Sequence, residues 1–223
     1  MRDIRRTWLL MVGTGAMVIA GALAPAQAGA QVTGSGIRVS KDAYTPTVSE
    51  TATGTVIDAP GFNAVDAEVY RSMTDANIMA HMIVGDSLEI EMARLAAERA
   101  GDPEVREFAR MLVDDHSRHL ATSLEMSRDE DIGSTPAEGD RHAVTLRRMI
   151  SQLRTMGSSP AFDRAFLRYQ IRHHDHEVNG LRAMRPAARD DDLEQHIDET
   201  LPILERHLAR ARELGGRLGV TTP

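Results

Sequence analysis

The sequence predicts an all-α fold built around an antiparallel four-helix bundle with one longer, helical crossover connection. Composition is the first indication, because aromatic residues make up only 4% of the chain and the apolar residues are mainly Ala, Leu, Met, Val and Ile. Unbranched side chains lose little rotamer freedom in a helix, so this mixture favours helices over strands. From Thr74 onward, apolar residues also recur at three- and four-residue steps, with no competing strand alternation.

Capping and stop signals bound the four long helices. An N-cap residue followed by proline at the first helical position occurs at Asp102-Pro103 and again at Ser159-Pro160. Thr74 and Asp191 begin the other two helices, and glycines follow the ends of the first and the last. These signals predict helices over residues 74–100, 103–128, 160–184 and 191–216.

The connections between the helices determine the topology. The short links at 101–102 and 185–190 make the helices on either side of each link antiparallel neighbours. The connection over 129–158 is longer, and a capping box at Thr135-Pro136-Ala137-Glu138 predicts a connecting helix that ends near Gly157. Two helical hairpins joined in this way form the ferritin-like arrangement, which we expect over residues 73–216.

The first thirty residues are predicted to be a signal peptide. A basic start, MRDIRR, is followed by an apolar run from Trp8 to Ala24 and by small residues that suit cleavage after Ala28 or Ala30. An uncleaved anchor is the alternative, but glycines interrupt the run and it falls short of the roughly 20 apolar residues a span needs. RRTWLL resembles a twin-arginine signal, and the choice of export route stays open.

Two further segments are expected to lie outside the bundle. Residues 31–72 are rich in Thr, Ser, Gly, Val and Ala, with no lasting period, and are interpreted as a flexible tether with a short strand or helix near its end. Residues 217–223 are expected to be a disordered tail.

Composition also excludes several classes of function. A net charge of −7 argues against nucleic-acid binding, which needs a basic face. The chain has no cysteine, so disulfides, thiolate metal sites and a thiol nucleophile are excluded. No Gly-x-Ser-x-Gly elbow or other catalytic motif is present, and the sequence therefore favours a non-enzymatic role.

Ionisable residues fall on the inward stripes of the predicted helices. His174 lies off its stripe and, with His142 and His196, is expected to face solvent, whereas His81 is expected to pack near the inner face of the first helix. The methionines are interpreted as core residues rather than copper ligands. The inward positions are Glu89, His116, His119, His173, His176 and His207.

These inward residues are expected to share one level of the bundle. Glu89 lies twelve residues before Gly101 and His116 fourteen after Asp102, so they are about equally far from their common turn. Imidazoles and carboxylates that converge from facing helices are how bundles build metal sites. The alternative is a buried polar network in which Glu89, Asp115 and Asp175 accept hydrogen bonds from histidines.

Three stretches resemble a known family: LEIEMARLAAERAGDPEVREFARMLVDDH, AFDRAFLRYQIRHHDHEV and TLPILERHL. The sequence is similar to the bacterial family called domain of unknown function 4142 over about residues 74–215. The resemblance implies a fold related to ferritins and export or an outer-membrane association, but no reaction. The family's recurring Glu-x-Glu, Asp-His, Asp-His and His features would fall on Glu89 and Glu91, Asp115-His116, Asp175-His176, and His207.

Two functional hypotheses remain. The first is an exported bundle that binds a transition metal for sequestration or stress defence. Zinc, copper or a single iron would suit it, because the paired Glu-x-x-His motifs of di-iron centres are missing. The second is a metal-free structural or interaction protein of the cell envelope with a buried histidine–carboxylate network. The expected ligands are Glu89, His116, His176 and His207, with His119, His173, Asp115 and Asp175 as secondary candidates.

Localisation follows from the predicted signal peptide. We expect a periplasmic or outer-envelope protein that is soluble after cleavage. The sequence leaves envelope association, homo-oligomerisation and the physiological partner open.

Overall fold

The computed structural model describes residues 48–51, 54–57, 62–129 and 132–220. The predicted signal peptide lies outside the described residues, as do most of the predicted tether and the end of the predicted tail. Within the predicted tether, strands β1 (Val48–Thr51) and β2 (Gly54–Ile57) pair antiparallel, with Val48 opposite Ile57.

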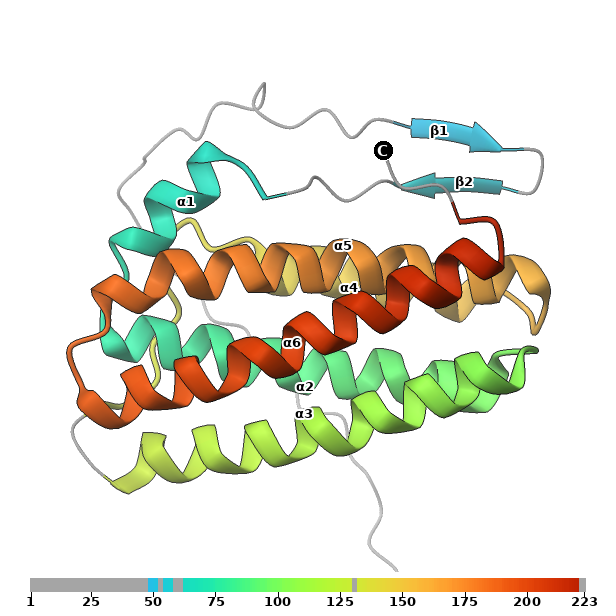
Figure 1. Ribbon diagram of the computed structural model, residues 1–223. Coiled ribbons are helices and arrows are strands. Elements are labelled where there is room, and N and C mark those ends of the chain that lie inside the picture. The colour runs from blue at the N-terminus through green and yellow to red at the C-terminus, as the bar shows by residue number, and fades with distance from the viewer. Residues whose placement is uncertain (1–47, 52–53, 58–61, 130–131, 221–223) are drawn as a thin grey trace, which may run out of the picture. The chain divides into compact units, whose positions relative to one another are not determined.

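Four long helices form the antiparallel bundle that the sequence predicts (Figure 1). Helices α2 (Asp75–Arg99) and α3 (Pro103–Asp129) make the first hairpin. Helices α5 (Pro160–Met184) and α6 (Asp191–Arg217) make the second, joined by the short 3-10 helix η2 (Arg185–Ala187). Helix α4 (His142–Thr155) lies in the crossover between the hairpins. None of the described helices is both long enough and apolar enough to cross a membrane.

The start of the crossover helix differs from the sequence-based expectation. The connecting helix begins at His142, and not at the capping box beginning at Thr135. Gly139 has a φ of 86°, which interrupts a helix, and the backbone N–H of Thr135 donates to the carbonyl of Ala76 over 2.9 Å. That contact ties the segment to the start of α2 instead.

A further helix, α1 (Ala64–Arg71), occupies the end of the predicted tether. Asn63 caps it with a capping box, and its Tyr70 is only 2% exposed. Helix α1 packs against α5, so this part of the chain belongs to the bundle.

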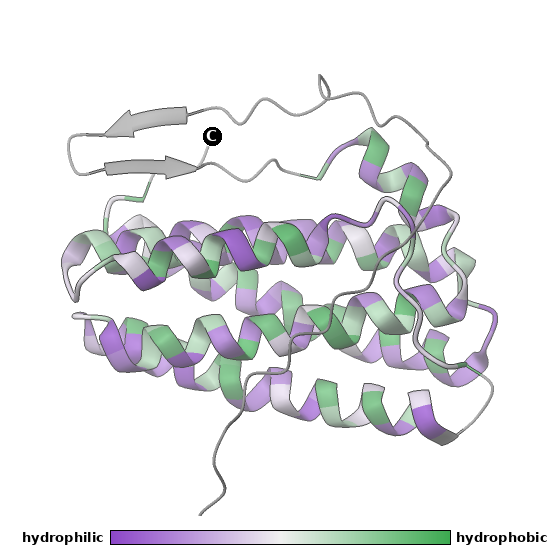
Figure 2. Ribbon diagram, turned by 180° about the vertical axis from the view of Figure 1, so that it is seen from behind, coloured by the Kyte–Doolittle hydropathy of each residue, from purple (hydrophilic) through white to green (hydrophobic). Residues whose placement is uncertain are grey.

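Helix α5 is covered on more than one side. It contacts α6, its hairpin partner, and also α1, α2 and α4. Figure 2 shows hydrophobic and hydrophilic residues mixed along the long helices rather than one wholly apolar helix. Because α5 has neighbours on several sides, polar residues on two of its faces become buried.

The apolar core has two parts with a polar layer between them. On α5, the first part includes Phe162 and Phe166, and the second includes Val178 and Leu181. Between these positions the same helix carries buried polar residues over 170–177. The middle of the bundle is therefore a layer of titratable side chains enclosed by apolar packing.

The carboxylate of Asp163 joins the two hairpins at one end. It accepts hydrogen bonds from the backbone N–H groups of Gly101 and Asp102, each over 2.9 Å, and it is 3% exposed. Two backbone donors in the α2–α3 turn thus depend on a side chain from the first turn of α5.

We expect Asp163→Ala to lower the free energy of unfolding by about 2–3 kcal/mol, because it leaves these two donors without their charged acceptor. Urea unfolding followed by circular dichroism measures the change. Asp163→Asn keeps one acceptor oxygen, so its free energy of unfolding should lie between those of the parent and of Asp163→Ala. An alanine variant within about 0.5 kcal/mol of the parent would contradict the role of this carboxylate.

Candidate metal centres

All nine histidines of the chain lie in the helical domain, and eight of them are buried. The expectation that His142, His174 and His196 face solvent is wrong, since they are only 5%, 0% and 6% exposed. His174 faces α3 and α6, His142 lies on the crossover helix, and His196 lies 3.1 Å from the hydroxyl of Ser123 on α3. His81 is buried as expected.

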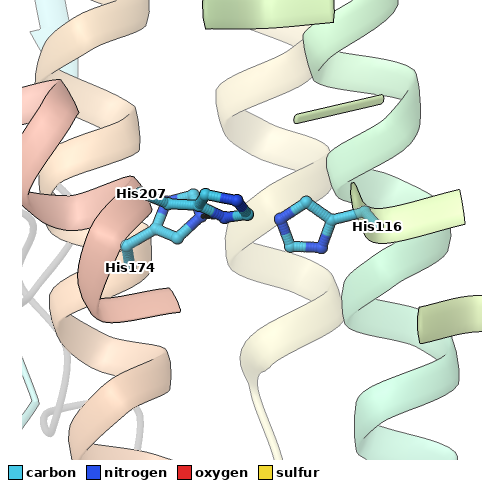
Figure 3. Close-up of side chains that lie close together, drawn as sticks. All are labelled: His116, His174 and His207. Atoms are coloured by element: carbon cyan, nitrogen blue, oxygen red, sulfur yellow. Dashed lines mark hydrogen bonds between the residues drawn. The ribbon is translucent and has the colours of Figure 1, made fainter. Parts of the chain in front are cut away.

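The first cluster brings together His116 from α3, His174 from α5 and His207 from α6. One potential donor atom from each lies within 4.8 Å of the other two. Figure 3 shows the rings of His174 and His207 side by side, with the ring of His116 facing them. The Nδ1 atom of His207 is 3.2 Å from Nε2 of His174. We call these three residues the trihistidine cluster.

A neighbouring oxygen holds the other nitrogen of each ring. Nδ1 of His116 lies 2.8 Å from Oδ1 of Asp86, and Nε2 of His207 lies 2.7 Å from Oδ2 of Asp115. Nδ1 of His174 donates to the backbone carbonyl of Gln170 over 3.1 Å. Nε2 of His116 is buried and has no hydrogen-bond partner. The remaining nitrogens of the three rings are Nε2 of His116 and the pair Nε2 of His174 and Nδ1 of His207, which lie within hydrogen-bonding distance of each other.

The second cluster joins His81 from α2, His142 from α4 and Glu177 from α5. Oε1 of Glu177 lies 3.3 Å from Nε2 of His81 and 3.2 Å from Nδ1 of His142. Nδ1 of His81 is in turn 2.8 Å from Oδ2 of Asp140. We call His81, His142 and Glu177 the mixed cluster.

A third group consists of Asp86, His116 and His119, so it shares His116 with the trihistidine cluster. Nδ1 of His119 is buried without a hydrogen-bond partner, and its ring lies edge-on to His196. Asp86 contacts Nδ1 of His116. Asp86 is therefore placed to orient the His116 ring toward His174 and His207.

The structure brings together only part of the ligand set expected from the sequence. His116 and His207 meet in the trihistidine cluster, whereas no group of three potential ligands among the described residues contains Glu89 or His176. Glu89 accepts a hydrogen bond from Gln170 over 2.5 Å, and its other oxygen lies 3.4 Å from His173. His176 instead lies 2.8 Å from the hydroxyl of Tyr70.

The secondary candidates also separate. Asp115 contacts Nε2 of His207 and so orients its ring. His119 belongs to the third group. The ring of His173 stacks on that of His142 with centroids 5.3 Å apart. Asp175 is turned to the surface, where it pairs with Arg212 over 2.9 Å.

The ligand set expected from the sequence did not include His174, Glu177 or His142. His174 lies on a second stripe of α5 that includes Leu167, Ile171 and Leu181, all of them 5% exposed or less. Those apolar positions are a signal in the sequence, since they recur at helical steps on a second face. His142 carried no such signal, because its burial depends on where the crossover helix packs.

Burial keeps most of these imidazoles neutral. It lowers the pKa of His116, His142 and His207 to about 4 and raises the pKa of Asp86 to about 8. A neutral imidazole has a lone pair on one nitrogen, which is the form that binds metals.

His81 and Glu177 behave differently because they are close to opposite charges. Although burial alone would lower the pKa of His81, the Glu177 charge and the hydrogen bond to Asp140 raise it to about 10. Burial opposes ionisation of Glu177, but His142 and His81 hold its pKa well below the usual range. Glu177 is thus an ionised carboxylate between a protonated ring, His81, and a neutral one, His142, and an ion bound there would displace a proton from His81.

The chain is a helical bundle with buried histidine and glutamate clusters, and it belongs to the family described as domain of unknown function 4142, which matches residues 62–214. No functionally curated protein matches it. It is similar in fold to the solved structure "CopM in the Cu(II)-bound form", with a TM-score of 0.51 and 19% identity over 65% of this chain and 97% of that chain.

We expect Gly180→Ala to destabilise the domain. A Cβ atom there would lie 2.9 Å from Cε2 of Tyr70, so the ring would have to move and its contact with His176 would weaken. Overpacking of this kind costs about 1–3 kcal/mol. Thermal unfolding measures the change.

Gly216→Ala is the matched control, because it lies in α6 and a Cβ atom there meets nothing within 4 Å. The helical preference for alanine should raise its stability by up to about 1 kcal/mol. If both variants shifted the melting temperature upward, the close approach of α1 to α5 would be disproved.

Proposed function

We propose that this domain binds a transition metal ion, with copper(II) or zinc favoured, through His116, His174 and His207. The observation that carries the proposal is the convergence of three imidazole nitrogens whose opposite nitrogens are each held by Asp86, Asp115 or a backbone carbonyl. Orientation of ligating histidines by carboxylates and carbonyls is typical of metal sites.

Spacing supports the same set. Two nitrogens that each lie about 2.0–2.1 Å from a tetrahedral ion are about 3.3 Å apart. The observed separation between Nδ1 of His207 and Nε2 of His174 is 3.2 Å. A hydrogen bond between the two rings fits this distance as well, but it leaves the buried Nε2 of His116 without a partner. An ion would satisfy all three nitrogens.

The donor set favours particular metals. Imidazole suits zinc, copper, iron and nickel, and the Irving–Williams order places copper(II) highest for a nitrogen site. The solved structure of similar fold is described as Cu(II)-bound, which supports testing copper first.

A role in holding the metal suits the site better than catalysis. His116, His174 and His207 are each at most 2% exposed, and closed sites are typical of structural or storage functions rather than of turnover. The predicted signal peptide would place this function in the periplasm or outer envelope, where the protein would sequester metal or act in stress defence.

We expect His174→Gln to weaken copper(II) binding at this site by at least about 100-fold, because it removes one of the three histidines that would bind the ion directly. Isothermal titration of metal-free protein measures affinity, and electron paramagnetic resonance reports nitrogen coupling to bound copper(II). Asp115→Asn, which removes only the support of His207, should weaken binding about 10–100-fold.

His196→Gln is the matched control. His196 is buried to a similar degree but contacts Ser123 and belongs to none of the three groups, so affinity should not change. Equal copper affinity in the parent and His174→Gln proteins would overturn the proposal. That result would favour the metal-free envelope protein, with the histidines serving as a buried polar network.

A further inference from the structure

We propose that His81, His142 and Glu177 form a second metal site with a mixed nitrogen and oxygen ligand set. It differs from the trihistidine cluster in its residues, in the faces it joins and in its charge. Helix α5 contributes Glu177 here, from a face turned to α2 and α4, whereas its His174 is turned to α3 and α6. This site does not depend on the function proposed for the trihistidine cluster.

The distances match a small coordination sphere. Oε1 of Glu177 is 3.3 Å from Nε2 of His81 and 3.2 Å from Nδ1 of His142. Two ligand atoms of a tetrahedral ion are separated by a similar distance, about 3.3 Å. The three donors lie within 4.8 Å of one another. Each residue is at most 6% exposed, so water competes little for these positions.

One carboxylate organises both histidines. Oδ2 of Asp140 lies 2.8 Å from Nδ1 of His81, while Oδ1 accepts a hydrogen bond from the backbone N–H of His142 over 2.9 Å. The carboxylate–histidine pair holds the His81 ring with Nε2 toward Glu177. The backbone contact positions the start of α4, and with it the second imidazole. Asp140 is therefore a positioning residue for the site.

Helix α2 leaves space beside the donors. A Cβ atom at Gly85 would lie 3.0 Å from Nε2 of His142 and 3.7 Å from Oε2 of Glu177. Nε2 of His142 is buried and has no hydrogen-bond partner. The glycine thus leaves room for the His142 ring, whose Nε2 lies toward Gly85 while its Nδ1 faces Glu177.

A ligand set of two imidazoles and one carboxylate favours different metal ions from a set of three imidazoles. This is the donor set of histidine–glutamate zinc sites and of mononuclear iron(II) sites. We therefore expect zinc, or cobalt(II) as its spectroscopic substitute, to bind here, while copper(II) prefers the trihistidine cluster.

Cobalt(II) and zinc titrations of the full-length, metal-free protein test the inference. The parent should bind two equivalents, and Glu177→Gln should bind one and lose part of the visible cobalt absorption. Glu89→Gln is the matched control, because Glu89 is an equally buried glutamate that belongs to none of the three groups; it should still bind two. Far-ultraviolet circular dichroism shows whether each variant is folded.

Two further variants keep the test decisive. Gly85→Ala retains every ligand but places a methyl group against His142, so it should weaken the second equivalent even if Glu177→Gln fails to fold. His174→Gln should remove the other equivalent. If Glu177→Gln or Gly85→Ala bound two equivalents with parental affinity, the mixed site would be disproved.

The outcomes also separate the two sites. A parent that binds one equivalent, lost in Glu177→Gln but kept in His174→Gln, would support the mixed site and show that cobalt(II) and zinc do not occupy the trihistidine cluster. A single equivalent lost in His174→Gln and kept in Glu177→Gln would mean that Glu177 only forms a metal-free ion pair with His81.

Discussion

The layer of titratable side chains at the centre of the bundle is the constraint on which the rest of the structure depends. Buried imidazoles and carboxylates are costly unless each polar atom has a partner, so their positions must be set together. Here, carboxylates on neighbouring segments meet most of the rings, as Asp115 of α3 meets His207 and Asp140, just before α4, meets His81. Nε2 of His116, which stays unsatisfied, marks a position where a ligand would complete the layer.

Helix α5 makes this layer possible because it is covered on several sides. Its consecutive residues His173 and His174 point to different neighbours, Glu89 on α2 and His207 on α6. Through His174 and Glu177, the same helix supplies potential ligands to two separate clusters. The apolar clusters toward the two ends enclose the layer and supply the hydrophobic stabilisation. An ion bound in the layer would add stability by favouring the folded state over the unfolded one.

The two proposed centres are built in the same way, but their donor atoms differ in hardness as metal ligands. Each has ligands from three helices and a carboxylate that fixes the orientation of a histidine. The trihistidine cluster is neutral at its donors, whereas the mixed cluster contains the ionised Glu177. The two clusters would therefore offer bound ions different environments within one domain.

The sequence by itself determined the bundle and its helices, because caps, prolines and three- and four-residue apolar steps are local signals. Helices α2, α3, α5 and α6 begin and end within about a residue or two of their expected bounds. It also indicated that His116 and His207 would meet, since both lie on the main inward stripes. The burial of His174 follows the apolar steps on a second face of α5, whereas only the tertiary structure decided that His142 and Glu177 are buried. The burial of these two residues depends on how α4 packs against α2 and α5, and that packing is a long-range contact that no local period encodes.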